Sequence, residues 1–155
     1  MKPVLRKQLL RDDKELFAQG ACHIFANELY KRLAPHGFTL RRLADTNRST
    51  VEFEALHVYV GKGSTMVDVD GIRNETDFIQ EMEEFRNNKP VPAFKVFQCS
   101  HEELFTPVGR ESDADEGIGN RWNHIIEEDF TAACRKRAHN IFAASPAKYN
   151  PNLTN

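Results

Sequence analysis

Three residues in the first half of the chain carry side chains that together could perform nucleophilic catalysis: Cys22, His57 and Asp68. A thiolate is a strong nucleophile, an imidazole can take up and return its proton, and a carboxylate can orient the imidazole and stabilise its cation. Cys22 follows Gly20 and Ala21 at the start of a predicted helix. The positive end of the helix dipole at that point favours the thiolate.

A predicted β-hairpin with glycines around its tip brings the histidine and the aspartate together. With Lys62 and Gly63 as the turn residues, His57 lies directly opposite Asp68. Side chains at opposed positions project to the same side, with Cβ atoms about 5 Å apart. Asp70 has the same parity and is the alternative residue to orient His57. The other, apolar face of the hairpin then consists of Val58, Val60, Val67 and Val69.

The elements that must position these residues predict an α+β fold, in which the helix that carries the cysteine packs on an antiparallel β-sheet. Hydrophobic periodicity and chain breakers predict helices at 4–18, 21–33, 77–85 and 121–143, and a short helix opened by a capping box at 100–103. Alternating or apolar runs predict strands at 38–43, 51–55, 57–60, 65–69 and 94–97. We expect one domain over residues 1–144 and a flexible tail at 145–155.

Three stretches of the sequence resemble the papain-like superfamily in the broad sense. They are GACHIFA at 20–26, LHVYV at 56–60 and MVDVD at 66–70. The transglutaminase-like and arylamine acetyltransferase branches of that superfamily carry a Cys-His-Asp triad in this chain order. The resemblance covers roughly a third of the chain, and it implies a papain-like fold.

The resemblance also implies a role for each matching residue. Cys22 is the expected nucleophile, His57 the general base and acid, and Asp68 the group that orients His57. The backbone N–H of Cys22 is one expected donor to the oxyanion, and Gln19 is the candidate for a second donor. His23 lies where papain has a tryptophan near its cysteine, and we expect it at the rim of the site.

These residues predict a cytoplasmic thiol hydrolase or acyltransferase of the peptidase, amidase or deamidase type. It would act on a peptide, amide or acyl group through an acyl-enzyme, without cofactor or metal. A catalytically inert interaction or adaptor protein of the same fold, with Cys22 in its core, is the second hypothesis. A third is that the acidic residues 111–117 bind a cation or a basic partner, although their spacing does not match a calcium loop.

Composition narrows the classes of protein further. The 155 residues carry a formal net charge of -2, which argues against a nucleic-acid partner. No apolar run approaches the length of a membrane span, and the first residues lack the apolar segment of a signal peptide. Cys99 and Cys134 are widely spaced from each other and from Cys22, so we expect core thiols, with neither a disulfide framework nor a zinc site. The sequence does not specify a particular substrate or an oligomeric state.

Overall fold

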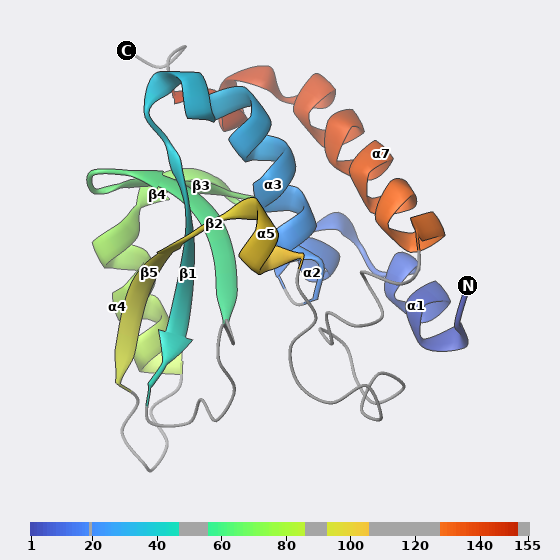
Figure 1. The fold of residues 1–155 in the computed structure, drawn as a ribbon, viewed down its shortest axis with the longest axis horizontal. Helices are drawn as coiled ribbons and strands as arrows, with labels where there is room; N and C mark the ends of the chain where they lie inside the picture. The colour runs from blue at the N-terminus through green and yellow to red at the C-terminus, as the bar shows by residue number, and fades with distance from the viewer. Residues whose placement is uncertain (19, 47–55, 86–92, 106–127, 152–155) are drawn as a thin grey trace.

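The computed structural model describes residues 1–18, 20–46, 56–85, 93–105 and 128–151. Its described part is an α+β fold with one antiparallel sheet in the order β4-β3-β2-β1-β5 (Figure 1). The strands are β1 (Thr39–Asp45), β2 (His57–Lys62), β3 (Thr65–Asp68), β4 (Gly71–Asn74) and β5 (Phe94–Cys99). The helices are α1 (Pro3–Leu9), α2 (Asp13–Ala18), α3 (Cys22–Leu33), η1 (Ala34–His36), α4 (Glu75–Phe85), α5 (His101–Leu104), α7 (Glu128–Ala144) and η3 (Pro146–Tyr149).

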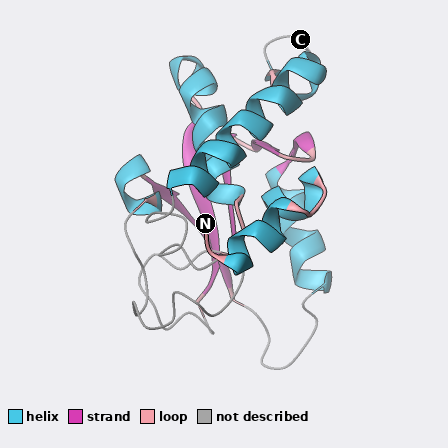
Figure 2. Ribbon diagram, turned by 90° about the vertical axis from the view of Figure 1, so that its right-hand side faces the viewer, coloured by secondary structure: helices cyan, strands magenta, loops and turns pink. Residues whose placement is uncertain are grey.

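Helices cover both faces of the sheet because the strands are apolar on both sides. Helix α3 packs on β2, and α7 lies against α3 on the side away from the sheet (Figures 1 and 2). The predicted valine face is confirmed, since all four valines belong to the buried core that contains α3. On the opposite face, Phe78 of α4 packs with Leu43, Tyr59 and Met66 in a second, smaller core.

The predicted helix over 4–18 is two helices. Asp12 separates them, and its side chain accepts a hydrogen bond of 2.8 Å from the backbone N–H of Glu15. Such a bond begins a new helix at α2. Arg137 of α7 also donates to the backbone carbonyls of Leu9 and Arg11 at the end of α1. The break is therefore stabilised by a residue that lies far away in the sequence.

The hairpin forms with a register that differs from the predicted one by two residues. Lys62 pairs with Thr65, so the turn residues are Gly63 and Ser64. Gly63 adopts a φ of 57°, which glycine reaches without strain. Asp68 therefore lies diagonal to His57 and not directly opposite. A shift of two residues keeps every side chain on its predicted face, whereas a shift of one would reverse them all.

Strand β4 was not predicted from the sequence. It pairs with β3 through a tight connection in which Gly71 has a φ of 98°. Helix α4 begins earlier than predicted, and the Asn74 side chain before it accepts a 3.1 Å hydrogen bond from the Asp77 N–H. The capping box at Ser100 is confirmed. The predicted strand at 51–55, the start of the helix at 121–127 and the acidic residues 111–117 lie outside the described residues.

The expectation of a flexible tail is wrong for the segment that follows α7. Tyr149 of η3 is buried, and its ring packs against Phe25 and Phe142. Its hydroxyl donates a 2.7 Å hydrogen bond to the carbonyl of Val69, directly after β3. The aromatic ring and its one buried hydroxyl explain the docking, because burial of the ring removes apolar surface from water. The η3 segment therefore packs against the turn that follows Asp68.

Candidate active site

Cys22 is the first residue of α3 and is half-buried at the edge of the main core. Because α3 packs on β2, the start of the helix lies beside the start of that strand. The Cys22 sulfur accepts hydrogen bonds from the backbone N–H groups of His23 and Val58, and its third partner is the side chain of His57. The predicted meeting of cysteine and histidine therefore exists in the fold.

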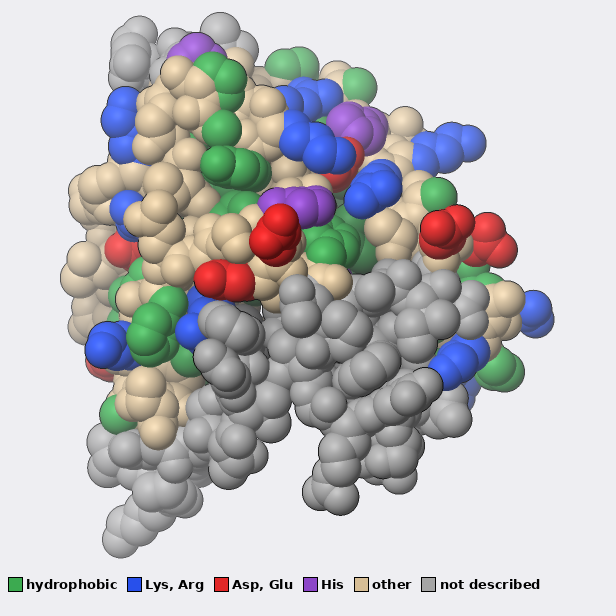
Figure 3. Space-filling view, viewed as in Figure 1, with side chains coloured by type: hydrophobic (Ala, Val, Ile, Leu, Met, Phe, Trp, Pro, Cys, Tyr) green, Lys and Arg blue, Asp and Glu red, His purple; other side chains and the backbone are tan. Residues whose placement is uncertain are grey.

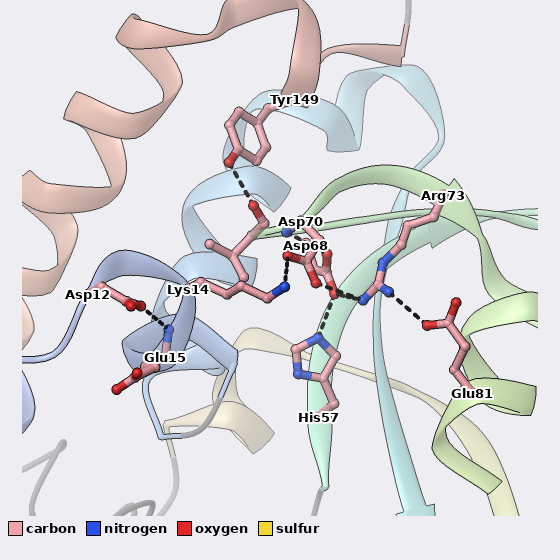
Figure 4. Close-up of polar contacts among 10 residues, drawn as sticks. Asp12, Lys14, Glu15, His57, Asp68, Asp70, Arg73, Glu81 and Tyr149 are labelled. Atoms are coloured by element: carbon pink, nitrogen blue, oxygen red, sulfur yellow. Dashed lines mark hydrogen bonds and ion pairs between the residues drawn. The ribbon is translucent and has the colours of Figure 1, made fainter. Parts of the chain in front are cut away.

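His57 bridges the thiol and the carboxylate. Its Nε2 lies 2.8 Å from Oδ2 of Asp68, as Figure 4 shows, and both side chains are almost fully buried, with 7% and 3% of their surface exposed. Since Nε2 is engaged by Asp68, Nδ1 is the ring nitrogen left for Cys22. The three side chains form one hydrogen-bonded chain in the order predicted from the sequence.

The Asp68 carboxylate has partners at both oxygens. Oδ2 also accepts a 2.7 Å bond from Nη2 of Arg73, and Oδ1 accepts a 2.9 Å bond from the backbone N–H of Asp70 (Figure 4). The Asp70 side chain, the alternative predicted partner of His57, instead forms ion pairs of 3.5 Å with Lys14 and with Arg73. The geometry therefore pairs His57 with Asp68.

Aromatic rings enclose the imidazole. Tyr59 stacks on His57 with a centroid separation of 5.9 Å, and Phe78 of α4 lies 5.3 Å away. The Tyr59 hydroxyl donates to Oε2 of Glu75 at 2.9 Å, and the same oxygen accepts a 2.7 Å bond from Arg41. These groups exclude water from one side of the ring and fix its plane.

Burial and pairing act in opposite directions on the ionisation of the site. Burial opposes the charged form of Cys22, but the hydrogen bond and charge of His57 outweigh it and lower the pKa of the thiol. Burial likewise opposes the imidazolium, but the bonds to Asp68 and Cys22 raise the pKa of His57 to about 9. Burial is outweighed at Asp68 too, where His57 and Arg73 lower the pKa of the carboxyl. The arrangement can therefore hold a thiolate beside a proton donor.

The remaining predicted site residues do not join this group. Gln19 lies outside the described residues. The expectation that His23 lines the rim is wrong, because its side chain is buried, with its ring 5.6 Å from that of Phe105. Burial raises the pKa of Cys134 to about 12, and Cys99 is half-buried against the main core. Cys22 differs from both in its hydrogen bond to His57.

Sequence reasoning missed Arg73 and the enclosing role of Tyr59 and Phe78. Tyr59 could have been found, since it has the same strand parity as His57. Arg73 lies on β4, a strand that was not predicted, so its approach to Asp68 left no local signal.

The described residues contain no group of three or more His, Cys, Asp or Glu side chains placed to hold a metal ion. Among the described helices, none has the length and apolar character needed to cross a membrane. The chain matches no family model, no curated protein and no solved structure. Assignment of a function therefore depends on the geometry of the site itself.

Proposed function

We propose that the chain is a papain-like thiol hydrolase or acyltransferase that acts on a peptide, amide or acyl group through Cys22. The observation that carries this proposal is the continuous hydrogen-bonded chain from the Cys22 thiol through His57 to the buried Asp68. Each member has the partner that its role needs: a base beside the nucleophile, and a carboxylate that orients the base. The pKa directions of the thiol and the imidazole support the same assignment.

The proposed reaction has two halves. The Cys22 thiolate attacks the carbonyl carbon of the substrate, and the negative charge moves to the carbonyl oxygen, where the backbone N–H of Cys22 is the expected donor. His57 gives its proton to the leaving amine or alcohol as the carbon–heteroatom bond breaks and a thioester forms. Water or another acceptor then loses a proton to His57 and attacks the thioester. The product leaves, and the thiolate–imidazolium pair is restored.

A catalytically inert protein of the same fold is the alternative. The observation that favours it is the burial of His57 and Asp68, because a structural ion pair can also be an almost fully buried histidine–aspartate bond. The two proposals differ in the reactivity of Cys22, which a structural pair would leave ordinary.

The deciding experiment is the pH dependence of iodoacetamide labelling, measured separately for each of the three cysteines by mass spectrometry. We expect Cys22 to react rapidly well below about pH 8.5, where a free thiol ionises, and to slow strongly in His57→Ala. His139→Ala is the matched control, because His139 also bonds a buried carboxylate at 2.8 Å but lies away from the thiol. Labelling of Cys22 only after unfolding, or at the ordinary thiol pH, contradicts the proposal.

A second experiment tests the covalent intermediate. A panel of activated esters, thioesters and amides is incubated with the protein, and the peptide that contains Cys22 is examined for the added acyl mass. We expect at least one adduct that forms in the wild type, decays in water or transfers to an amine, and is absent in Cys22→Ala. Turnover that survives unchanged in Cys22→Ala would exclude acyl transfer through this residue.

A further inference from the structure

Arg73 is connected to the candidate site by two independent contacts. Its Nη2 lies 2.7 Å from Oδ2 of Asp68, the same oxygen that His57 Nε2 approaches to 2.8 Å (Figure 4). Its guanidinium carbon also lies 4.7 Å above the ring of Phe78, and Phe78 in turn packs against His57. Arg73, Asp68, His57 and Phe78 therefore form a closed ring of contacts.

Two further acidic groups lie near the Arg73 guanidinium. Asp70 lies 3.5 Å from Nη2, and Glu81 of α4 lies 3.6 Å from Nη1. The shortest of these ion pairs is the 2.7 Å contact between Nη2 and Oδ2 of Asp68. Arg73 itself is only about one-quarter exposed, at 25% of its side-chain surface. The contact is therefore better ordered than an exposed ion pair.

We propose that Arg73 is a positioning residue of the site, which fixes the Asp68 carboxylate and divides its Oδ2 between the guanidinium and the His57 imidazole. This inference rests on the proposed function, because it concerns how the same three residues are tuned. The contacts of Arg73 are with Asp68, Asp70, Glu81 and Phe78, so its effect on the thiol passes through Asp68 and through the charge that it places nearby.

The consequence is a limit on how strongly His57 holds its proton. Full use of Oδ2 by His57 would strengthen the imidazolium, and an acid that holds its proton too strongly is a poor donor to a leaving group. The positive guanidinium opposes protonation of His57 and, at longer range, favours the Cys22 thiolate. Arg73 therefore lowers the pKa of both partners, so that the Cys22 thiolate persists to lower pH and the His57 imidazolium gives up its proton more readily than with Asp68 alone.

Other charged and titratable groups face this network from each neighbouring element. From the described residues they are Lys14 of α2, Arg41 of β1, Tyr59 of β2, Asp70 after β3, Glu75 and Glu81 of α4, and Tyr149 of η3. Among the described lysine and arginine residues, Arg73 is the one that bonds Asp68, so its removal changes the charge at the carboxylate most directly.

The test is the variant Arg73→Gln, which keeps a donor for Asp68 and removes the charge. Two quantities are measured: the Cys22 labelling rate against pH, and the titration of the His57 ring by NMR. We expect both transitions to move to higher pH, by about one unit for His57 and by less for Cys22. Arg73→Lys restores the charge and should recover most of the shift.

A purely structural role gives a different result. Loosening of the site would return the pKa of each group toward its ordinary value. The Cys22 transition would then move to higher pH, while the His57 transition would fall toward about pH 6.5. That pattern, or no change in either transition, overturns the inference. Arg135→Gln is the matched control, because Arg135 of α7 also pairs with an almost fully buried carboxylate, that of Glu28 at 3.9 Å, and not with Asp68. We expect both of its transitions to match the wild type.

A measurement on the wild type covers the case in which Arg73→Gln does not fold. If Arg73 and His57 share one oxygen, the side-chain N–H resonances of Arg73 titrate with the His57 pKa. Resonances that do not follow His57 overturn the inference. If wild-type Cys22 instead titrates as an ordinary thiol, the proposed function fails and this inference fails with it, whereas an activated Cys22 that is indifferent to Arg73→Gln contradicts the inference alone.

Discussion

The described part of the protein contains two histidine–carboxylate pairs of the same length in different surroundings. His57 lies 2.8 Å from Asp68 on the sheet, and His139 of α7 lies 2.8 Å from Glu28 of α3. Both carboxylates are only 3% exposed, and both have further cationic partners. Figure 3 shows Lys and Arg side chains gathered around a histidine and an acidic side chain over α3 and α7. A short bond between a histidine and a buried carboxylate therefore does not by itself identify an active site.

The difference lies at the second ring nitrogen. Nδ1 of His139 is 3.3 Å from Nη2 of Arg32, and a guanidinium can only donate, so that nitrogen acts as an acceptor. The ring of His57 instead meets the Cys22 thiol, which can give up its proton. The His139 ring is also half-exposed, at 49%, whereas His57 is enclosed by aromatic rings. A reactive pair needs both a proton donor and exclusion of water, and of these two histidines His57 has both.

The largest expected contrast comes from removing the charge of each carboxylate. Asp68→Asn should slow Cys22 labelling at neutral pH about 100-fold or more, because the imidazole loses both its orientation and the stabilisation of its cation. Glu28→Gln should leave labelling unchanged and lower the free energy of unfolding by about 2 kcal/mol, because several cations lose their buried partner. Rapid-mixing labelling and urea unfolding measure the two effects. Equal losses of labelling in both variants would remove the distinction between the pairs.

The second prediction concerns the pH dependence of stability. The bonds of His57 raise its pKa to about 9 in the folded chain, above about 6.5 when unfolded, so its stabilisation is complete at low pH and is lost as the pH rises through about 9. The pKa of Cys22 is lowered, so its stabilisation is present at high pH and is lost as the pH falls through its folded pKa. In the wild type, His57 makes the free energy of unfolding fall with rising pH and Cys22 makes it rise. These two slopes oppose each other between about pH 6.5 and 8.5.

Cys22→Ala removes one of those slopes and leaves His57 bonded to Asp68. We expect the free energy of unfolding of this variant to fall with pH over that window more steeply than in the wild type. Urea unfolding at several pH values measures the slope, and Cys99→Ala, at another half-buried cysteine, is the control expected to match the wild type. Identical slopes in Cys22→Ala and the wild type would mean that the thiol stays protonated in the fold.

Tyr149 links the two regions and gives the third prediction. Its hydroxyl bonds the carbonyl of Val69 beside Asp68, and its ring packs on Phe142, which contacts His139. Tyr149→Phe keeps the ring and removes the bond, so the expected loss is about 1 kcal/mol in the free energy of unfolding. Thermal or urea unfolding measures it. Unchanged stability would show that the segment after α7 packs through its ring alone.

The smallest effect is expected at Asp70. Its carboxylate pairs with Lys14 and Arg73 and lies one-third exposed, at 33%. Asp70→Asn should therefore change the rate of Cys22 labelling by less than about twofold, since partly exposed ion pairs contribute little. The labelling assay used for Asp68→Asn measures it on the same scale. A loss as large as that of Asp68→Asn would assign the orienting role to Asp70.

Part of this site was predictable because it depends on local patterns. The helix that opens at Cys22 follows from its apolar spacing, and His57 and Asp68 share a face because strand side chains alternate with a period of two. The predicted pairing register was wrong by two residues, yet the shared face survived. The choice between Asp68 and Asp70 depended on the true register and on β4, and the sequence left it open.

Other features left no local signal because they are made by residues that lie far apart in the chain. Arg137 of α7 stabilises the end of α1, and Tyr149 of η3 packs against the turn after Asp68. The enclosure of His57 needs Phe78 of α4. Helix spacing and strand alternation describe each element by itself, so they do not show which side chains from separate elements will meet.

The sequence by itself determined the types of side chain available, the α+β class and the face on which each strand residue lies. The tertiary structure decided which histidine meets the thiol, which carboxylate it bonds and how deeply the pair is buried. The physical reason is that ionisation depends on distance and solvent exposure in space, and folding sets both. Two pairs of equal length can therefore differ in chemistry, with a thiol beside His57 and an arginine beside His139.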